Sequence, residues 1–265
     1  LFTSLAEYRQ HLNPDRPTVG ITFPRSYWLE HNTAHIEALV TAVEELDANT
    51  VPFFCLRLPD ARRGNPGMAQ VLENLLRDDE GRCVVDTLVD VHGMSMTAGV
   101  PANADAYPNL GVSVLHALTS YAPRAAWQAT AQGMGSMDVA TQAAQPEFDG
   151  ALITKLLATR EADEVDDLTG AVVPRMVPVP GRAQAMAELA LSWARLARTP
   201  ADQRKVAIVF HHHPPRNDRI GCASGLDTFE SVRQLLIRMA DEGYDVPEQF
   251  ETGDDIAQVL LSCLT

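Results

Sequence analysis

The sequence Thr18-Val19-Gly20-Ile21-Thr22-Phe23 is a short run of apolar and β-branched residues that follows Pro14 and Pro17. A run of this kind, bounded by turn-forming residues, predicts a buried β-strand. Residues 33–46 then repeat apolar side chains at the three- and four-residue spacing of an amphipathic helix. Residues 51–56 return to an apolar strand pattern. This strand–helix–strand unit predicts a parallel sheet.

The same alternation continues along the chain. It predicts further strands at residues 82–91, 111–115, 139–144, 151–157 and 206–210. It predicts further helices at residues 68–76, 124–132, 182–197, 228–242 and 254–264. Two stretches, 94–109 and 161–179, are rich in turn-forming or acidic residues and predict loops.

We therefore expect an α/β fold of the Rossmann or flavodoxin-like kind, with mostly parallel sheets and helices on both faces. Two lobes are expected, residues 1–203 as the first domain and residues 204–265 as the start of a second βα lobe. Residues 206–210 are expected to be a buried strand of that second lobe, because they form an unbroken apolar run. In the helix 182–197, a buried stripe is expected from Met186, Leu189, Ala190, Trp193 and Leu196.

Composition excludes several classes of function. The chain has 265 residues and a formal net charge of −14, which argues against nucleic acid as a partner because phosphate contacts need clustered Lys and Arg. No apolar run reaches the length of a membrane span, and no signal peptide is visible. The four cysteines form no CxxC pair, so we expect reduced thiols and a cytoplasmic protein. The GxxxxGK[ST] phosphate loop is absent, so this chain is not itself an ATP-hydrolysing motor.

Several blocks of sequence, taken in order and spacing, carry a family resemblance. The C-terminal block comprises Lys205-Val-Ala-Ile-Val-Phe, Pro214-Pro215, Ile220-Gly221, Gly225-Leu226-Asp227-Thr228 and Glu242-Gly243-Tyr244-Asp245-Val246. Earlier blocks comprise Arg25-Ser26, Asn32-Thr33-Ala34-His35-Ile36, Ala140-Thr141-Gln142 and Pro146-Glu147-Phe148-Asp149-Gly150. Together they resemble the large subunits of cobaltochelatase (the CobN family) and magnesium chelatase. The chain departs from the family at His212-His213, where the family usually has Asn-Tyr.

The resemblance implies a function for the whole enzyme. Such an enzyme inserts cobalt, its substrate metal, into a corrin precursor (hydrogenobyrinic acid a,c-diamide), and AAA+ partner subunits hydrolyse the ATP. The large subunit holds the tetrapyrrole. Two alternatives stay open, a porphyrin-binding subunit of the magnesium chelatase type and a non-catalytic scaffold domain. Because family members are several times longer, we expect this chain to be a portion of such a subunit and inactive by itself.

Metal insertion needs groups that accept protons and that bind borderline divalent cations, and His and carboxylates do both. Glu147 lies between two predicted strands and is a candidate catalytic residue, with a plain turn as the alternative. His211 directly follows the predicted strand 206–210 and is the second catalytic candidate. His213 shares its side of an extended chain and is a candidate substrate-binding residue, with exposed loop histidines as the alternative.

Two other predicted strand ends carry candidate substrate-binding residues, because ligands of open α/β sheets gather at the carboxyl ends of strands. Arg25 and Ser26 follow the first strand, and His92 ends the third and opens a Gly- and Ala-rich loop that could close as a lid. His31 and His35 are four residues apart, but no third metal ligand accompanies them, and surface positions are the favoured interpretation. No metal ligand is assigned from the sequence.

Overall fold

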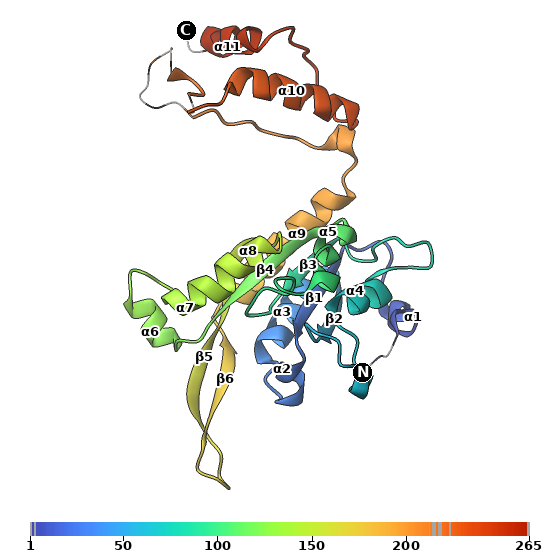
Figure 1. Ribbon diagram of the computed structural model, residues 1–265, viewed down its shortest axis with the longest axis vertical. Coiled ribbons are helices and arrows are strands. Elements are labelled where there is room, and N and C mark those ends of the chain that lie inside the picture. The colour runs from blue at the N-terminus through green and yellow to red at the C-terminus, as the bar shows by residue number, and fades with distance from the viewer. Residues whose placement is uncertain are drawn as a thin grey trace. The chain divides into compact units, whose positions relative to one another are not determined.

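The structure is a computed structural model that describes residues 2, 4–211, 213, 216, 219–222 and 224–263, with the backbone alone at positions 163 and 164. The chain divides into two compact units, Leu1–Arg198 and Thr199–Thr265 (Figure 1). Within the described ranges, no helix is long and apolar enough to cross a membrane.

The first unit is built on a six-stranded sheet with the order β2-β1-β3-β4-β5-β6. The strands are β1 (Thr18–Pro24), β2 (Asn49–Cys55), β3 (Thr87–Asp90), β4 (Ser113–Ser120), β5 (Leu152–Val165) and β6 (Val172–Pro178). All neighbouring pairs from β2 to β5 are parallel, and β6 runs antiparallel to β5. The expected mostly parallel α/β fold is confirmed, and the first five strands have the flavodoxin-like order.

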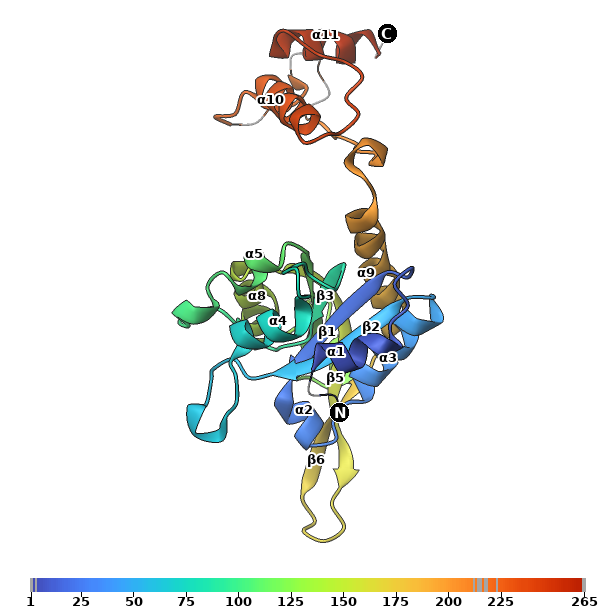
Figure 2. The same ribbon diagram turned by 90° about the vertical axis from the view of Figure 1, so that its right-hand side faces the viewer.

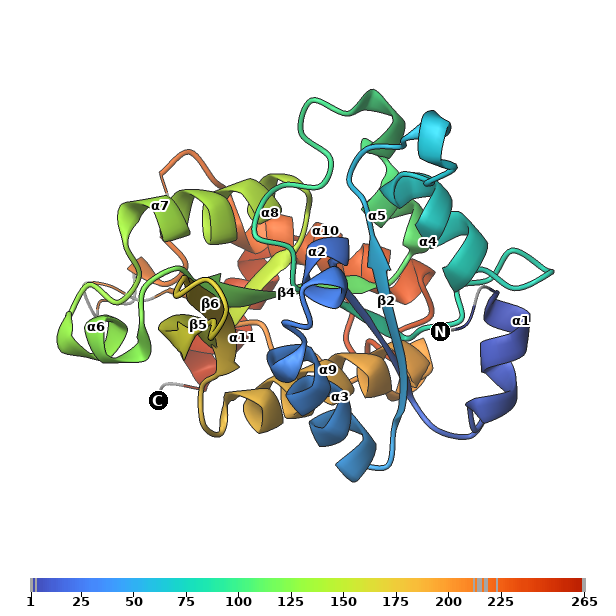
Figure 3. The ribbon, with the colours of Figure 1, turned by 90° about the horizontal axis from the view of Figure 1, so that it is seen from below.

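Alternation along the strands gives the sheet two apolar faces. Val19 and Ile21 of β1 pack with α3 (Ala34–Glu45) and α9 (Arg182–Arg198) on one face. On the other face, Val51 and Phe53 of β2 pack with α4 (Met68–Leu76) and α5 (Ala106–Leu110). The helices therefore cover both sides of the sheet (Figure 3).

Shorter helices connect these elements. They are α1 (Leu5–Tyr8), η1 (Arg9–His11), α2 (Arg25–Leu29), η2 (Ala61–Arg63), η3 (Pro101–Asn103), α6 (Arg124–Ala129), α7 (Ser136–Asp138), the π-helical turn η4 (Val139–Ala144) and α8 (Gln145–Phe148). The predicted strand at 139–144 is wrong. This segment holds three alanines in six residues, and strong helix formers outweigh its apolar character.

The predicted loop at 161–179 is also wrong in large part. Its residues form the end of β5 and all of β6, an antiparallel ribbon that extends beyond the rest of the sheet (Figure 2). Exposed side chains such as Val172 and Val177 leave the ribbon without a clear apolar–polar alternation, so periodicity could not reveal it. The predicted loop at 94–109 likewise contains η3 and most of α5, and it buries Met96 and Tyr107.

The second unit contains η5 (Ala201–Gln203), α10 (Thr228–Asp241) and α11 (Gly253–Ser262). Asp227 caps α10 by accepting a hydrogen bond from the Glu230 amide at 3.0 Å. The predicted strand at 206–210 is wrong, because these residues are extended without strand pairing and Val209 is 90% exposed. A buried parallel strand needs neighbouring strands, and the described part of this unit has none.

Helix α9 is confirmed, and its expected buried stripe is confirmed in part, because Met186 and Ala190 are buried and Leu189 packs partly buried against the core. Met186, Ala187, Ala190, Leu191 and Ala194 are buried. Trp193 is only partly buried against the core, and Leu196 is 45% exposed. Met186, Ala187, Ala190 and Leu191 pack in the core with α3 and the sheet, and Leu196 falls outside this group.

We predict that Leu191→Ala lowers the free energy of unfolding by about 2–5 kcal/mol, because it leaves a cavity between α9 and the sheet. Leu196→Ala on the same helix is the matched control and should change stability by less than about 1 kcal/mol. Denaturant unfolding followed by circular dichroism measures both. Equal effects of the two substitutions would contradict the observed stripe.

Candidate functional site

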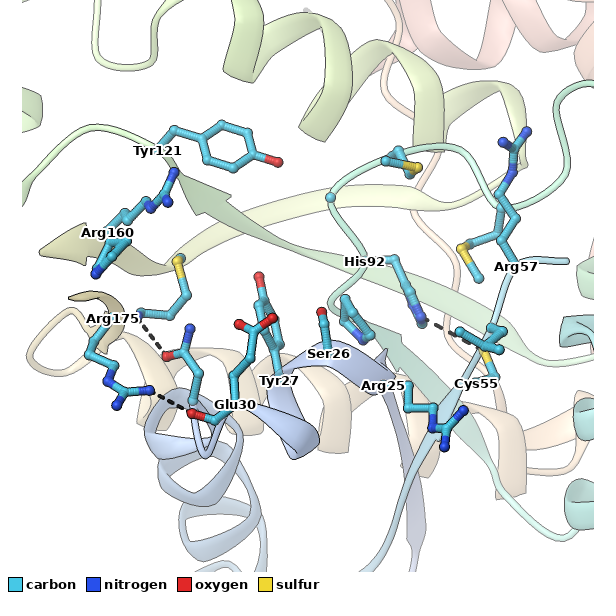
Figure 4. A pocket seen from close by; sticks show the side chains of 18 of the residues that line it. Arg25, Ser26, Tyr27, Glu30, Cys55, Arg57, His92, Tyr121, Arg160 and Arg175 are labelled. Atoms are coloured by element: carbon cyan, nitrogen blue, oxygen red, sulfur yellow. Dashed lines mark hydrogen bonds between the residues drawn. The ribbon is translucent and has the colours of Figure 1, made fainter. Parts of the chain in front are cut away.

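A pocket of about 750 Å³ opens at the carboxyl edge of the parallel strands (Figure 4). It receives residues that follow β1, β2, β3 and β4, together with residues of β5 and β6. In the strand order, β2 and β3 flank β1. The chain therefore runs from β1 to β2 on one side and then crosses to β3 on the other side of β1. A switch of this kind opens a crevice at the carboxyl ends of the strands, which is the usual ligand site of open α/β sheets.

The wall of the pocket is cationic although the chain as a whole is acidic. Arg25 comes from α2, Arg57 follows β2, Arg160 lies on β5 and Arg175 lies on β6 (Figure 4). Glu30 is the single acidic residue among the described residues that line the pocket. Since the formal net charge of the chain is −14, this concentration of guanidinium groups marks a place for an anionic ligand.

Two of these arginines are held by backbone carbonyls. The Arg175 guanidinium donates to the Glu30 carbonyl oxygen at 2.6 Å, which joins β6 to the end of α2. Arg57 donates to the carbonyl oxygen of Ala98. Such bonds fix the direction of a long side chain before a ligand arrives and so reduce the entropy lost on binding.

The floor of the pocket contains a buried ion pair. His92 Nδ1 lies 2.7 Å from Asp90 Oδ1, and both side chains are almost fully buried. Tyr107 of α5 donates its hydroxyl to Asp90 Oδ2 at 3.0 Å. His116 of β4 places Nδ1 3.6 Å from the same oxygen. Because side chains alternate along a strand, Asp90 and His116 both face the α5 side of the sheet, where Tyr107 can reach them.

This pairing sets the protonation states. Burial alone would lower the pKa of His92, but the adjacent Asp90 carboxylate outweighs burial and raises the pKa to about 10. Burial alone would raise the pKa of Asp90, but the imidazoles of His92 and His116 hold it well below its usual range. At neutral pH, His92 is therefore an imidazolium and Asp90 a carboxylate, so the floor holds a net-neutral ion pair and the positive charge of the pocket comes from its arginines.

A carboxylate outside the pocket fixes the loop that forms one of its sides. Asp149 is buried and accepts hydrogen bonds from Ser95 Oγ at 2.5 Å, from the Met96 amide at 2.6 Å and from Thr97 Oγ1. The loop after His92 is thus tied down at three successive residues, rather than free to move as a lid over this span. Asp149 follows α8 directly, so the end of that helix and the loop after His92 are joined.

Gly93 shows how closely this loop is packed. A Cβ added at Gly93 would lie 2.6 Å from Gln142 Nε2 and 3.4 Å from the Tyr121 hydroxyl. Gln142 lies in the π-helical turn η4 and accepts a hydrogen bond from the Thr119 amide at 3.1 Å. A side chain immediately after His92 would therefore require the end of the Gln142 side chain to move.

The structure brings together three of the residues predicted from the sequence. Arg25, Ser26 and His92 all line the pocket. Glu147 lies in α8 rather than in a turn between strands, is exposed and does not line the pocket. Its assignment as a catalytic residue stays a prediction.

The other two candidates belong to the second unit. His211 and His213 are both exposed, and their ring centroids lie 6.3 Å apart. Their catalytic and substrate-binding roles stay predictions, and His212 lies outside the described residues. The favoured surface interpretation of His35 is wrong, because His35 is fully buried and packs edge-on against Tyr27 at 4.9 Å. Burial lowers the pKa of His35 to about 4, so it is neutral.

Sequence reasoning missed five residues of this site for identifiable reasons. Asp90 stands two residues before His92, and alternation along the strand was a signal that could have paired them. Arg160 and Arg175 fall in or beside the segment mistaken for a loop. Cys55 and Arg57 end a strand, a position that was used to select candidates elsewhere but not there.

We predict that Asp90→Asn lowers the free energy of unfolding by roughly 3–5 kcal/mol, because it leaves the buried His92 without its counter-charge. Asp105→Asn, an exposed aspartate beside α5, is the matched control and should have an effect of about 0.5 kcal/mol or less. Denaturant unfolding measures both. A neutral effect of Asp90→Asn would show that the pair does not stabilise the fold.

The pair also predicts a pH dependence. The pKa of His92 is raised from 6.5 to about 10, so its stabilising contribution is complete below pH 6.5 and is lost as the pH rises through 10. The melting temperature of the wild type relative to the double variant Asp90→Asn/His92→Gln should therefore fall across this interval. Thermal unfolding in a series of buffers from pH 6 to pH 10 measures the difference, and a constant difference would contradict the assigned charge states.

Comparisons with known proteins show which family this chain resembles. The CobN/Magnesium Chelatase family model matches residues 1–265. The chain is 30% identical to the aerobic cobaltochelatase subunit CobN of Sinorhizobium sp over 247 residues, which are 93% of this chain and 19% of that protein. It is 28% identical to a magnesium-chelatase subunit of Rhodobacter capsulatus over 277 residues, which are 98% of this chain and 22% of that protein.

A solved structure agrees with these relatives. The catalytic subunit of cobaltochelatase from Mycobacterium tuberculosis matches with a TM-score of 0.71 and 29% sequence identity, over 94% of this chain and 20% of that one. The chain thus spans about a fifth of the length of the relatives it matches. With its family model matched over every residue, the chain belongs to the CobN/Magnesium Chelatase family.

Proposed function

We propose that this chain forms the tetrapyrrole-binding part of the large subunit of an ATP-dependent metal chelatase. The observation that carries the proposal is the cationic pocket at the carboxyl edge of the sheet. Tetrapyrrole precursors carry several carboxylate arms around a flat apolar ring. Arg25, Arg160 and Arg175 offer separate guanidinium groups for such arms, and Met94, Met96 and Tyr121 offer apolar and aromatic surface for the ring.

In this proposal, the enzyme inserts cobalt into a corrin precursor, hydrogenobyrinic acid a,c-diamide, in the biosynthesis of cobalamin. In the same proposal, AAA+ partner subunits hydrolyse the ATP, and the sequence of this chain contains no GxxxxGK[ST] phosphate loop. The likeness to relatives named as cobaltochelatase subunits supports the cobalt branch. The reaction takes place in the cytoplasm, where the four free cysteines would remain reduced.

A second candidate has its own support. Relatives named as magnesium-chelatase subunits, from two bacteria, are 28% and 29% identical to this chain, close to the values for the cobaltochelatase subunits. The ligand would then be a porphyrin and the metal magnesium. The pocket geometry suits either ring, since about 750 Å³ lies within the usual range of ligand pockets, roughly 300–1,000 Å³.

We predict that Arg25→Gln and Arg160→Gln each weaken the binding of a tetrapyrrole carboxylate by roughly 10- to 100-fold, the effect of removing a hydrogen bond to a charged group. Arg62→Gln is the matched control, since Arg62 is exposed and outside the pocket wall. Quenching of protein fluorescence during titration with a corrin or porphyrin measures the affinity, and Trp28 of α2 is a suitable reporter.

Two further titrations sharpen this test. The methyl esters of the same ring should bind wild type and both pocket variants alike, because they lack the charges that the arginines recognise. Parallel titrations with a corrin precursor and a porphyrin compare the two branches directly. If both pocket variants retain the wild-type affinity, the proposed binding mode is wrong. If the wild type binds neither ring, a scaffold role without ligand becomes the better account.

A further inference from the structure

Cys55 and His92 meet at the floor of the pocket. Cys55 Sγ lies 3.7 Å from His92 Nε2 (Figure 4). Both residues line the pocket, and their exposed fractions are only 6% and 5%. A thiol and an imidazole nitrogen are both ligands of borderline and soft metal ions once they have lost their protons.

The fold places this pair by the positions of two strand ends. Cys55 is the last residue of β2, and His92 stands two residues after the end of β3. The two strands flank β1, and Thr22 of β1 lies between them, with its hydroxyl 3.8 Å from Cys55 Sγ. Cys55 thus belongs to a strand, and His92, which lies just beyond one, is held by its contact with Asp90 at 2.7 Å.

That separation suits a hydrogen bond between the two side chains, and it also suits a shared metal ion. With a metal–sulfur bond of about 2.3 Å, a metal–nitrogen bond of about 2.0–2.1 Å and tetrahedral angles, the sulfur and nitrogen ligands lie about 3.6 Å apart. The observed 3.7 Å therefore lets one ion bridge the two atoms with little movement.

A second observation concerns the orientation of the imidazole. Metal-binding histidines usually direct the other ring nitrogen to a carboxylate, which fixes the ring and makes it a better ligand. His92 Nδ1 has this partner in Asp90 at 2.7 Å, and Asp90 is itself fixed by the Tyr107 hydroxyl at 3.0 Å. Nε2 is consequently the nitrogen that faces Cys55 and the pocket.

We propose that Cys55 Sγ and His92 Nε2 form a two-ligand site for a divalent transition-metal ion such as Co²⁺ or Zn²⁺. On binding, the Cys55 thiol and the protonated His92 Nε2 each release a proton to water in the pocket, and no electron is transferred. Because protons compete for both atoms, the metal binds more tightly as the pH rises. The remaining coordination positions are open to the pocket and are filled by water.

A site with only two protein ligands suits the transfer of a metal ion rather than its permanent retention. No group of three or more His, Cys, Asp or Glu side chains suited to a metal exists in the described part of the chain. A site with open positions can release its ion to another ligand. The role as the place where a substrate metal waits beside the ring rests on the proposed function, whereas metal binding itself rests on the geometry alone. Thiolate ligands disfavour Mg²⁺, so the site favours the cobalt branch.

The test is titration of the purified protein with CoCl₂ without oxygen, followed by absorption spectroscopy. We expect a thiolate-to-cobalt charge-transfer band and the visible bands of low-coordinate Co²⁺. Cys55→Ser should abolish the charge-transfer band, and Asp90→Asn should weaken binding by roughly 10- to 100-fold. Cys222→Ser is the matched control because Cys222 is exposed and outside the pocket, and it should keep the full signal. Loss of the band in Cys222→Ser, or its survival in Cys55→Ser, would overturn the assignment.

A measurement on the wild type removes any dependence on how the variants fold. Alkylation with iodoacetamide, mapped by mass spectrometry, should modify Cys55 slowly and should be blocked at Cys55 by Co²⁺ or Zn²⁺ but not by Mg²⁺. Modification of Cys55 at the same rate with and without Co²⁺ would contradict the site. Ring binding is followed separately, through quenching by a metal-free tetrapyrrole. A protein that binds Co²⁺ at Cys55 but no tetrapyrrole would therefore refute the proposed function and leave the metal site intact.

Discussion

Asp90 and His92 form a buried ion pair at the carboxyl end of β3, and the floor of the pocket depends on it. The pair orients the His92 imidazole, and through Tyr107 it ties α5 to the sheet. The loop that leaves His92 is then anchored by Asp149 at Ser95, Met96 and Thr97. Because a buried charge without its partner costs several kcal/mol, the pair requires that β3, α5 and this loop be placed together.

The distribution of charge follows from the same architecture. Acidic side chains are spread over a chain with a net charge of −14, while four arginines from α2, β5, β6 and the end of β2 converge on one pocket. Those elements are far apart in the sequence. Parallel strands direct their carboxyl ends to one edge, which brings Arg25 and Arg57 together. Strand β6 pairs antiparallel with β5 and brings Arg175 back to the same pocket. The result is a local positive field that attracts an anionic ligand to a protein that otherwise repels it.

The sequence predicted the helices that bury one face and the strands that are buried on both faces. Strand β1 and helices α3 and α9 carry the apolar patterns that the structure uses. The failures have a common physical origin, since they fall where local pattern and tertiary context disagree. Residues 139–144 are apolar but alanine-rich and become helical, and residues 206–210 are apolar but have no strand to pair with in the described part of their unit.

The site was predictable to a similar extent. Arg25, Ser26 and His92 could be selected because they follow recognisable strands. Arg160 and Arg175 could not, because the β5–β6 ribbon is largely exposed and carries no periodic signal. Asp90 lies 2.7 Å from one ring nitrogen of His92, and its two-residue spacing from His92 was a signal that could have paired them. Cys55 lies 3.7 Å from the other ring nitrogen across the sheet, which no spacing along the chain reveals.

The most direct test of the central claim is a crystal structure of the protein with a carboxylated tetrapyrrole bound. The account predicts that the ring occupies the pocket at the carboxyl edge of β1, β3 and β4, with its carboxylates about 3 Å from the guanidinium groups of Arg25 or Arg160. A ring bound elsewhere on the protein, with this pocket empty, would contradict it.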